Sequence, residues 1–146
     1  DLPLVFALHP RTRANIDRFG LAGQIDPRCM VILPPQGYLE MLGLMAGATL
    51  VLTDSGGLQE ETTALGVPCL TLRENTERPI TVTAGTNTLV GRDSAAILRE
   101  VGEILAGRGK GGRAPELWDG QAAQRIAVDL GEWLLARHAG DCLGAK

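Results

Sequence analysis

The stretch TDSGGLQEE at residues 53–61 brings together residue types that bind anions. Ser55, Gly56 and Gly57 stand where an apolar run ends and a helical pattern begins. The first amides of a helix are unpaired and carry roughly half a positive charge, so they attract phosphate. Glycine lets phosphate oxygens approach the backbone, and the Ser55 hydroxyl adds one hydrogen bond. The stretch predicts an anion site, with a simple helix cap by Asp54 or Ser55 as the alternative.

The two glutamates at the end of this stretch point in different directions on the predicted helix. Glu61 lies one turn beyond Gly57, and helical side chains lean toward the N-terminus, so its carboxylate is in reach of a sugar hydroxyl beside bound phosphate. Glu60 points about 100° away, toward solvent or a basic partner. A solvated helix face is the alternative for Glu61.

Two further residues have suitable chemistry, and each precedes a proline. Arg78, in an aperiodic segment, would neutralise a diphosphate. His9, at the end of an apolar run, would donate a hydrogen bond to the same group or act as an acid. The alternatives are a solvated loop arginine and a histidine that only forms a turn.

An anion site of this kind needs a strand that ends and a helix that begins at one edge of a sheet. Apolar runs predict strands at 2–8, 30–33, 49–53, 67–72 and 88–90. Helical spacing predicts helices at 11–19 and 38–46, from the SGG stretch to Gly66, and at 95–106 and 120–137. This alternation predicts an α/β fold, a Rossmann-like parallel sheet with helices on both faces. Ligands of such sheets bind beyond the carboxyl ends of the strands.

Burial and connections follow from the same patterns. The first strand is apolar throughout, which indicates burial on both faces. The last helix is expected to bury Ile126, Leu130, Trp133 and Leu134. Residues 73–85 lack a period and predict a loop, with a short helix from Pro79 as an option, and GRGKGGR at 107–113 predicts a flexible connection. Residues 139–146 are expected to form a disordered tail.

Composition limits the class of protein. With 146 residues and 45% hydrophobic content the chain has material for one core, and we expect one domain over residues 1–138. A net charge of −3 with scattered basic residues argues against nucleic-acid binding. The longest apolar stretch, 41–52, is shorter than the about 20 residues of a membrane span.

The cysteines indicate a compartment. Cys29, Cys69 and Cys142 are far apart in the sequence and form no CxxC pair. This predicts a reducing compartment, the cytoplasm, and no structural metal. Cys69 lies within a predicted strand and is expected to be a core residue rather than a reactive thiol.

Longer motifs resemble a known family. TDSGGLQEE, LGVPCLTLRENTERPITVTAGTNTLVG and DGQAAQRI, together with HPRTR and PPQGYLEML, are similar to the C-terminal half of the non-hydrolysing UDP-N-acetylglucosamine 2-epimerases. The resemblance runs from about Leu2 to Arg137. It implies a two-domain fold of the GT-B glycosyltransferase type, with a nucleotide sugar between two Rossmann-like domains. This chain resembles the second of them.

The resemblance assigns the strongest candidates to UDP. Ser55, Gly56 and Gly57 would hold the diphosphate, Glu61 would hold the ribose, and Arg78 of TERP would face the phosphates. The implied reaction interconverts UDP-N-acetylglucosamine and UDP-N-acetylmannosamine. UDP leaves as the C2 proton is lost, and it returns as a proton is delivered to the other face of the sugar.

Three further roles come from the resemblance. His9 would lie near the phosphates as the candidate catalytic residue, and Gln36 and Met41 match positions near uracil, with Met41 standing where an aromatic residue is expected. The family's catalytic Asp and Glu lie in the first domain, which this chain is expected to lack. We therefore expect the chain to bind UDP weakly and not to epimerise alone, without metal or cofactor. The intact enzyme is expected to be a homodimer.

Other classes of protein remain open at this stage. A nucleotide-sugar donor domain of a GT-B glycosyltransferase would carry a similar phosphate loop and ribose-binding Glu. A non-catalytic nucleotide-sugar-binding module is a third alternative. Related enzymes that release UDP and free N-acetylmannosamine would also share these motifs.

Overall fold

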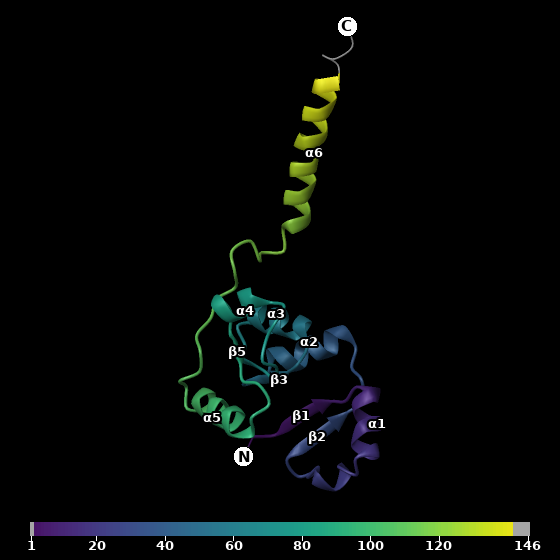
Figure 1. Ribbon diagram of the computed structural model, residues 1–146, viewed down its shortest axis with the longest axis vertical. Coiled ribbons are helices and arrows are strands. Elements are labelled where there is room, and N and C mark those ends of the chain that lie inside the picture. Colours follow the sequence, from purple (N-terminus) through teal and green to yellow (C-terminus); the bar gives the residue numbers. More distant parts are fainter. Residues whose placement is uncertain (1, 142–146) are drawn as a thin grey trace. The chain divides into compact units, whose positions relative to one another are not determined.

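The computed structural model describes residues 2–141 (Figure 1). The chain divides into two compact units, Asp1–Ala48 and Thr49–Lys146, and each is described by itself. The expectation of one domain over residues 1–138 stays a prediction. Strands and α-helices alternate as far as residue 105, as the sequence predicts, and a further helix follows.

The first unit holds a two-stranded parallel sheet. Its elements are β1 (Leu4–Ala7), α1 (Pro10–Arg18), the 3-10 helix η1 (Ala22–Gln24), β2 (Met30–Leu33) and α2 (Tyr38–Ala46). Strands β1 and β2 pair in parallel from Leu4 opposite Met30 to Ala7 opposite Leu33. Pro10 starts α1 at a position where its missing N–H removes no helical hydrogen bond.

Strand β1 forms where predicted, but the expectation that both of its faces are buried is wrong. Leu4 and Val5 are 47% and 50% exposed, whereas Leu8 beyond the strand is 2% exposed. An apolar run is buried on both faces only when elements cover both sides of the sheet. The described residues of this unit leave much of β1 uncovered.

The second unit carries a three-stranded parallel sheet. Its elements are β3 (Val51–Thr53), α3 (Gly56–Leu65), β4 (Cys69–Thr71), α4 (Pro79–Thr83), β5 (Asn87–Leu89), α5 (Ser94–Leu105) and α6 (Ala122–Asp141). The order β3-β4-β5 makes β4 central. Helix α3 contacts all three strands and α4 (Figure 1). Gly66, at φ 72°, ends α3 in the left-handed conformation that glycine adopts most easily, at the predicted stop.

The core of the second unit mixes apolar and polar side chains. Cys69 and Leu70 of β4 are 0% and 1% exposed, and Gln59 and Asn87 are also fully buried. Burial raises the pKa of the Cys69 thiol, so the thiol stays protonated and unreactive. The prediction of Cys69 as a core residue is confirmed.

Two residues of the segment 107–113 bond to backbone groups of the neighbouring elements, and the predicted flexibility of the segment stays a prediction. Burial lowers the pKa of Lys110, and its Nζ donates to the backbone carbonyl oxygens of Val82 and Asn87. The Arg113 N–H donates to the carbonyl oxygen of Ala84 at 3.0 Å. Gly112 lets two backbones approach closely, since a Cβ there would lie 2.3 Å from the Gly85 carbonyl carbon.

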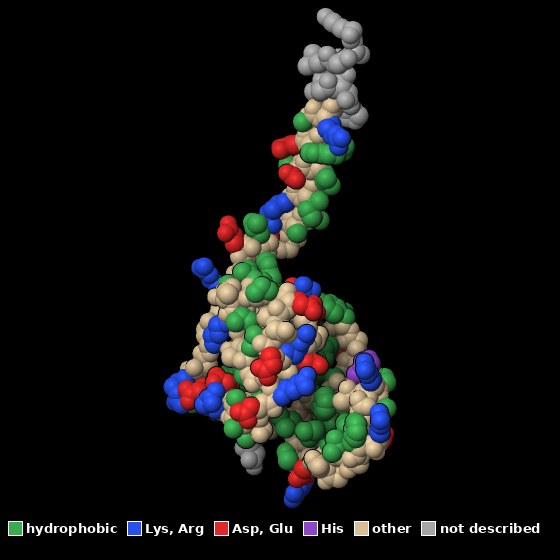
Figure 2. Space-filling model, in the orientation of Figure 1, with side chains coloured by type: hydrophobic (Ala, Val, Ile, Leu, Met, Phe, Trp, Pro, Cys, Tyr) green, Lys and Arg blue, Asp and Glu red, His purple; other side chains and the backbone are tan. Residues whose placement is uncertain are grey.

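Helix α6 forms, but the predicted burial of its apolar stripe is wrong. Its four members are 49% to 58% exposed, and Figure 2 shows apolar side chains along the helix surface. They are Ile126, Leu130, Trp133 and Leu134. Periodicity identifies a face suited to burial, but no other described element covers this one. Helix α6 runs to Asp141, so 142–146 of the predicted tail lie outside the described residues. Across 2–141, every helix is too short or too polar to span a bilayer.

Candidate functional site

The N-terminus of α3 is open at the carboxyl end of β3. Ser55 is the N-cap residue, with φ −84° and ψ 130°, yet its side chain makes no capping hydrogen bond. The Ser55 N–H donates to Thr53 Oγ1 at 3.0 Å, which shapes the turn between strand and helix. The alternative of a simple serine cap therefore does not describe this helix. Because the Ser55 hydroxyl does not cap the helix, this hydroxyl and the first-turn amides of α3 are available to an anion.

The two glycines of this turn have space in front of them. A Cβ built on Gly57 would meet only Ser55 Oγ, at 4.0 Å, and one built on Gly56 would meet the Arg78 side chain at 3.9 Å. Both distances are ordinary contacts, so packing within the described chain does not require glycine here. Glycine in a helix costs about 0.5–1 kcal/mol relative to alanine. The space is what an approaching anion would need.

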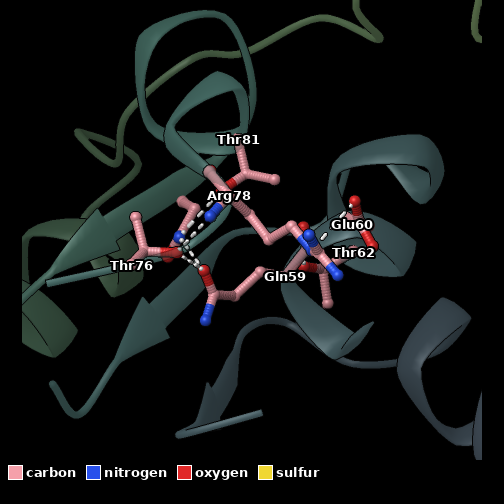
Figure 3. A network of polar contacts seen from close by, with 7 residues as sticks. Gln59, Glu60, Thr62, Thr76, Arg78 and Thr81 are labelled. Carbon is pink, nitrogen blue, oxygen red and sulfur yellow. Dashed lines mark hydrogen bonds and ion pairs between the residues drawn. The ribbon is translucent and has the colours of Figure 1, made fainter. Parts of the chain in front are cut away.

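Arg78 lies beside this turn. Its Cγ and Nε are each 3.9 Å from the Cβ position of Gly56. Its Nε forms an ion pair with Glu60 Oε1 at 3.2 Å, and the two side chains point toward each other in Figure 3. This confirms the pairing of Glu60 with a basic partner. Both side chains are partly exposed, so the pair contributes at most about 1 kcal/mol. Arg78 carries four further N–H donors on its two terminal nitrogens.

Glu61 is half-buried on the turn of α3 after Gly57. The structure thus brings together the predicted diphosphate residues Ser55, Gly56, Gly57 and Arg78. Binding of diphosphate by this group, and of ribose by Glu61, stays a prediction. The arrangement supplies positive charge and backbone donors.

The other three candidates belong to the first unit. His9 is the N-cap of α1, and its Nδ1 accepts from the Arg11 N–H at 3.2 Å, so a neutral ring carries its proton on Nε2. Gln36 Nε2 donates to the Pro34 carbonyl oxygen at 2.7 Å. Met41 is half-buried in α2. His9 therefore has the turn-forming role that was the alternative, and the proposed ligand roles of all three stay predictions.

The sequence did not single out the polar residues that hold the Arg78 loop, three of which are fully buried and one, Thr76, half-buried. These are Gln59, Thr76, Thr81 and Asn87. One signal was available: Gln59, Thr62 and Thr63 have the i, i+3, i+4 spacing of a buried helix face, and all three are buried. A search for apolar residues at that spacing overlooks a face made of polar ones.

The second unit is a parallel α/β fold, a class that binds ligands at the carboxyl ends of its strands. Comparison with known proteins then gives the family. The chain belongs to the UDP-N-acetylglucosamine 2-epimerase family, whose model matches residues 1–130. This confirms the resemblance read from the sequence, and solved relatives share the predicted fold class.

Three relatives indicate how far the match extends. A UDP-N-acetylglucosamine 2-epimerase of Methanocaldococcus jannaschii is 42% identical over 127 residues, 86% of this chain and 34% of that protein. A UDP-2,3-diacetamido-2,3-dideoxy-D-glucuronate 2-epimerase of Pseudomonas aeruginosa is 41% identical over 134 residues, 88% of this chain and 34% of that protein. The crystal structure of the Methanocaldococcus jannaschii enzyme in complex with UDP-GlcNAc and UDP has a TM-score of 0.77 at 39% identity, covering 89% of this chain and 36% of that one. The chain spans about a third of the length of these relatives.

Proposed function

We propose that this chain is the UDP-binding part of an epimerase that interconverts UDP-N-acetylglucosamine and UDP-N-acetylmannosamine. The observation that carries the proposal is the open first turn of α3 with Arg78 beside it. A relative of the same family has been solved with UDP-GlcNAc and UDP. In the proposed complex, Ser55, Gly56 and Gly57 hold the diphosphate together with Arg78, and Glu61 accepts from the ribose hydroxyls.

Three residues of the first unit have proposed ligand roles of their own. Gln36 and Met41 lie against uracil, and His9 donates to the phosphates through Nε2. The tautomer set by the Arg11 N–H supports that role, because it leaves the proton on Nε2.

The proposed reaction requires these residues to stabilise the diphosphate as it leaves the sugar. The C2–H bond and the bond from C1 to the diphosphate oxygen break, which gives a glycal and UDP, and both bonds then form again with the proton on the opposite face. A departing diphosphate must be stabilised and then retained, because loss of UDP would strand the intermediate. The α3 amides and Arg78 supply charge-assisted hydrogen bonds, each contributing about 1.5–3 kcal/mol.

Proton abstraction at C2 requires a positioned carboxylate, which this site does not offer. Glu60 is occupied by Arg78, and Glu61 follows it directly, so the two diverge on α3. We place the catalytic carboxylates in sequence beyond this chain, since the relatives are about three times as long. The proposed whole enzyme is a cytoplasmic homodimer that supplies cell-surface polysaccharide biosynthesis.

A second substrate fits the same site. The Pseudomonas aeruginosa relative, at 41% identity, is named for a different UDP-sugar. The residues proposed above contact UDP rather than the sugar, so they suit both substrates. The family match and the epimerase relatives favour epimerisation over glycosyl transfer.

Arg78→Ala is expected to weaken UDP binding at least tenfold in isothermal titration calorimetry, a loss of about 1.4 kcal/mol. The substitution removes the cation beside the α3 N-terminus and leaves the helix intact. Arg99→Ala is the matched control, since Arg99 is an exposed arginine of α5 paired with Glu100 and its loss changes the net charge equally. Equal UDP affinity in wild type and Arg78→Ala would remove Arg78 from the phosphate site.

The chain alone is expected to give no UDP-N-acetylmannosamine from UDP-N-acetylglucosamine, followed by proton NMR in deuterium oxide. A protein extended by the further sequence of its gene is expected to exchange the C2 proton for deuterium. The physical reason is the missing base at C2. Exchange by the isolated chain would show that a carboxylate within it serves as that base.

A further inference from the structure

A closed ring of hydrogen bonds includes the backbone N–H and the backbone carbonyl oxygen of Arg78. Asn87 Nδ2 donates to Gln59 Oε1 at 3.1 Å and to Thr81 Oγ1 at 3.0 Å. The Thr81 hydroxyl donates to the Arg78 carbonyl oxygen at 2.7 Å. The Arg78 N–H donates to Thr76 Oγ1 at 2.9 Å, and the Thr76 hydroxyl donates to Gln59 Oε1 at 2.6 Å, which closes the ring (Figure 3). Both backbone polar groups of Arg78 are therefore held.

The donors and acceptors of the ring have fixed roles: Asn87 Nδ2 donates twice, and Gln59 Oε1 accepts twice. The Asn87 amide uses its two hydrogens in the ring, while each hydroxyl accepts one hydrogen bond and donates one. Asn87 Oδ1 accepts from the Thr71 hydroxyl at 2.7 Å, which fixes the orientation of the amide. Rotation of any one of these side chains would break at least two hydrogen bonds. The ring therefore specifies one conformation of the loop.

Burial of the ring strengthens its preference for one conformation of the Arg78 loop. Gln59, Thr81 and Asn87 are fully buried, where hydrogen bonds are less weakened by water and an unmade one is costly. Gln59 Nε2 is buried without a partner in the described chain, which costs about 1–3 kcal/mol. An apolar side chain would avoid that cost, so the value of Gln59 lies in the two bonds that its Oε1 accepts.

We propose that this ring is a positioning device, with Gln59 and Asn87 as its buried anchors, that sets Arg78 beside Gly56 at the N-terminus of α3. The ring joins the site's elements: Gln59 belongs to α3, Asn87 to β5, and Thr81 to α4, which follows Arg78 directly. The part of the proposal that concerns ligand affinity rests on the proposed function. The part that concerns the place of Arg78 does not.

The first test reads the position of Arg78 without ligand. Thr76→Val removes the hydroxyl and keeps the shape, whereas Thr76→Ser keeps the hydroxyl. In wild type, NMR cross-peaks are expected between Arg78 side-chain protons and Gly56, because the Cβ position of Gly56 is 3.9 Å from Arg78 Cγ. They should vanish in Thr76→Val and persist in Thr76→Ser. Thr76→Ala replaces Thr76→Val should the valine variant fail to give a folded spectrum.

The second test asks whether Thr76 affects UDP affinity only by positioning Arg78. Thr76→Val should weaken UDP binding three- to tenfold, with Thr76→Ser restoring it. In an Arg78→Ala background, Thr76→Val should change affinity less than twofold, because a positioning residue has nothing left to position. A role limited to stability would lower the unfolding temperature and leave the affinity of folded protein unchanged.

The outcomes separate the two proposals. Cross-peaks that survive in folded Thr76→Val, or a loss of affinity that persists in the Arg78→Ala background, would overturn the positioning role. Wild-type protein that does not bind UDP would refute the proposed function instead. The cross-peaks would still decide whether the ring places Arg78.

Discussion

Gly57→Ala is expected to weaken UDP binding by about 10- to 100-fold while leaving the fold as stable as wild type or more stable. The binding loss corresponds to about 1.5–3 kcal/mol, the contribution of one charge-assisted hydrogen bond, because a methyl group would keep phosphate oxygens from the amides. In the described part of the chain the methyl group would meet Ser55 Oγ at 4.0 Å, an ordinary contact, so the folded chain accommodates it. Alanine also improves helix propensity by up to about 1 kcal/mol.

Gly57→Ala is expected to weaken UDP binding without lowering stability, so measuring both quantities tests the proposal directly. Calorimetry with UDP and with inorganic pyrophosphate reports binding, and thermal unfolding followed by circular dichroism reports stability. Gly131→Ala is the matched control, since Gly131 lies within helix α6 with nothing within 4 Å of its Cβ position. It should leave UDP binding unchanged. If Gly57→Ala binds both ligands as wild type does, the phosphate lies elsewhere; if Gly57→Ala unfolds at lower temperature, glycine serves the fold.

Elements were predictable from the sequence where local chemistry decides them. Gly66 ends α3 because the stop requires a left-handed residue, and Pro10 and Pro79 start helices because proline fits a first turn. Burial was less predictable, because it depends on what covers a face. The runs of β1 and α6 are apolar in sequence yet largely exposed in the described chain.

The candidate site likewise has one part that was predictable from the sequence and other parts that were not. The α3 turn was predictable because strand end, glycines and helix start are contiguous in sequence. The contact of Arg78 with that turn joins residues far apart in the chain, and the sequence suggested it only through family resemblance. The ring was not predicted, because Gln59 and Asn87 are polar residues whose burial depends on partners 28 positions apart. Hydrogen-bond partners at that separation leave no period in the sequence.

Gly85→Ala is expected to destabilise the protein by about 1–3 kcal/mol, since it inserts a methyl group into a filled space. A Cβ there would stand 2.4 Å from Thr63 Oγ1 of α3 and 2.6 Å from the Thr81 carbonyl oxygen of α4. Gly112 also lies close to Gly85, since a Cβ built on Gly112 would lie 2.3 Å from the Gly85 carbonyl carbon. With α3, α4 and the 107–113 segment all touching Gly85, the backbone has little room to move aside.

Differential scanning calorimetry should show a fall in Tm of about 4–12 °C for Gly85→Ala, taking roughly 4 °C per kcal/mol for a chain of 146 residues. Gly102→Ala, within α5 and with nothing near its Cβ position, should instead raise Tm slightly. Thr63→Ala in the Gly85→Ala background should recover part of the loss, because two of the three nearest atoms belong to Thr63. UDP affinity should fall with Gly85→Ala as well, since the clash pushes apart α3, which carries the open amides, and α4, which directly follows Arg78. A wild-type Tm for Gly85→Ala would mean that these helices are not packed through Gly85, and that another contact keeps Arg78 near α3.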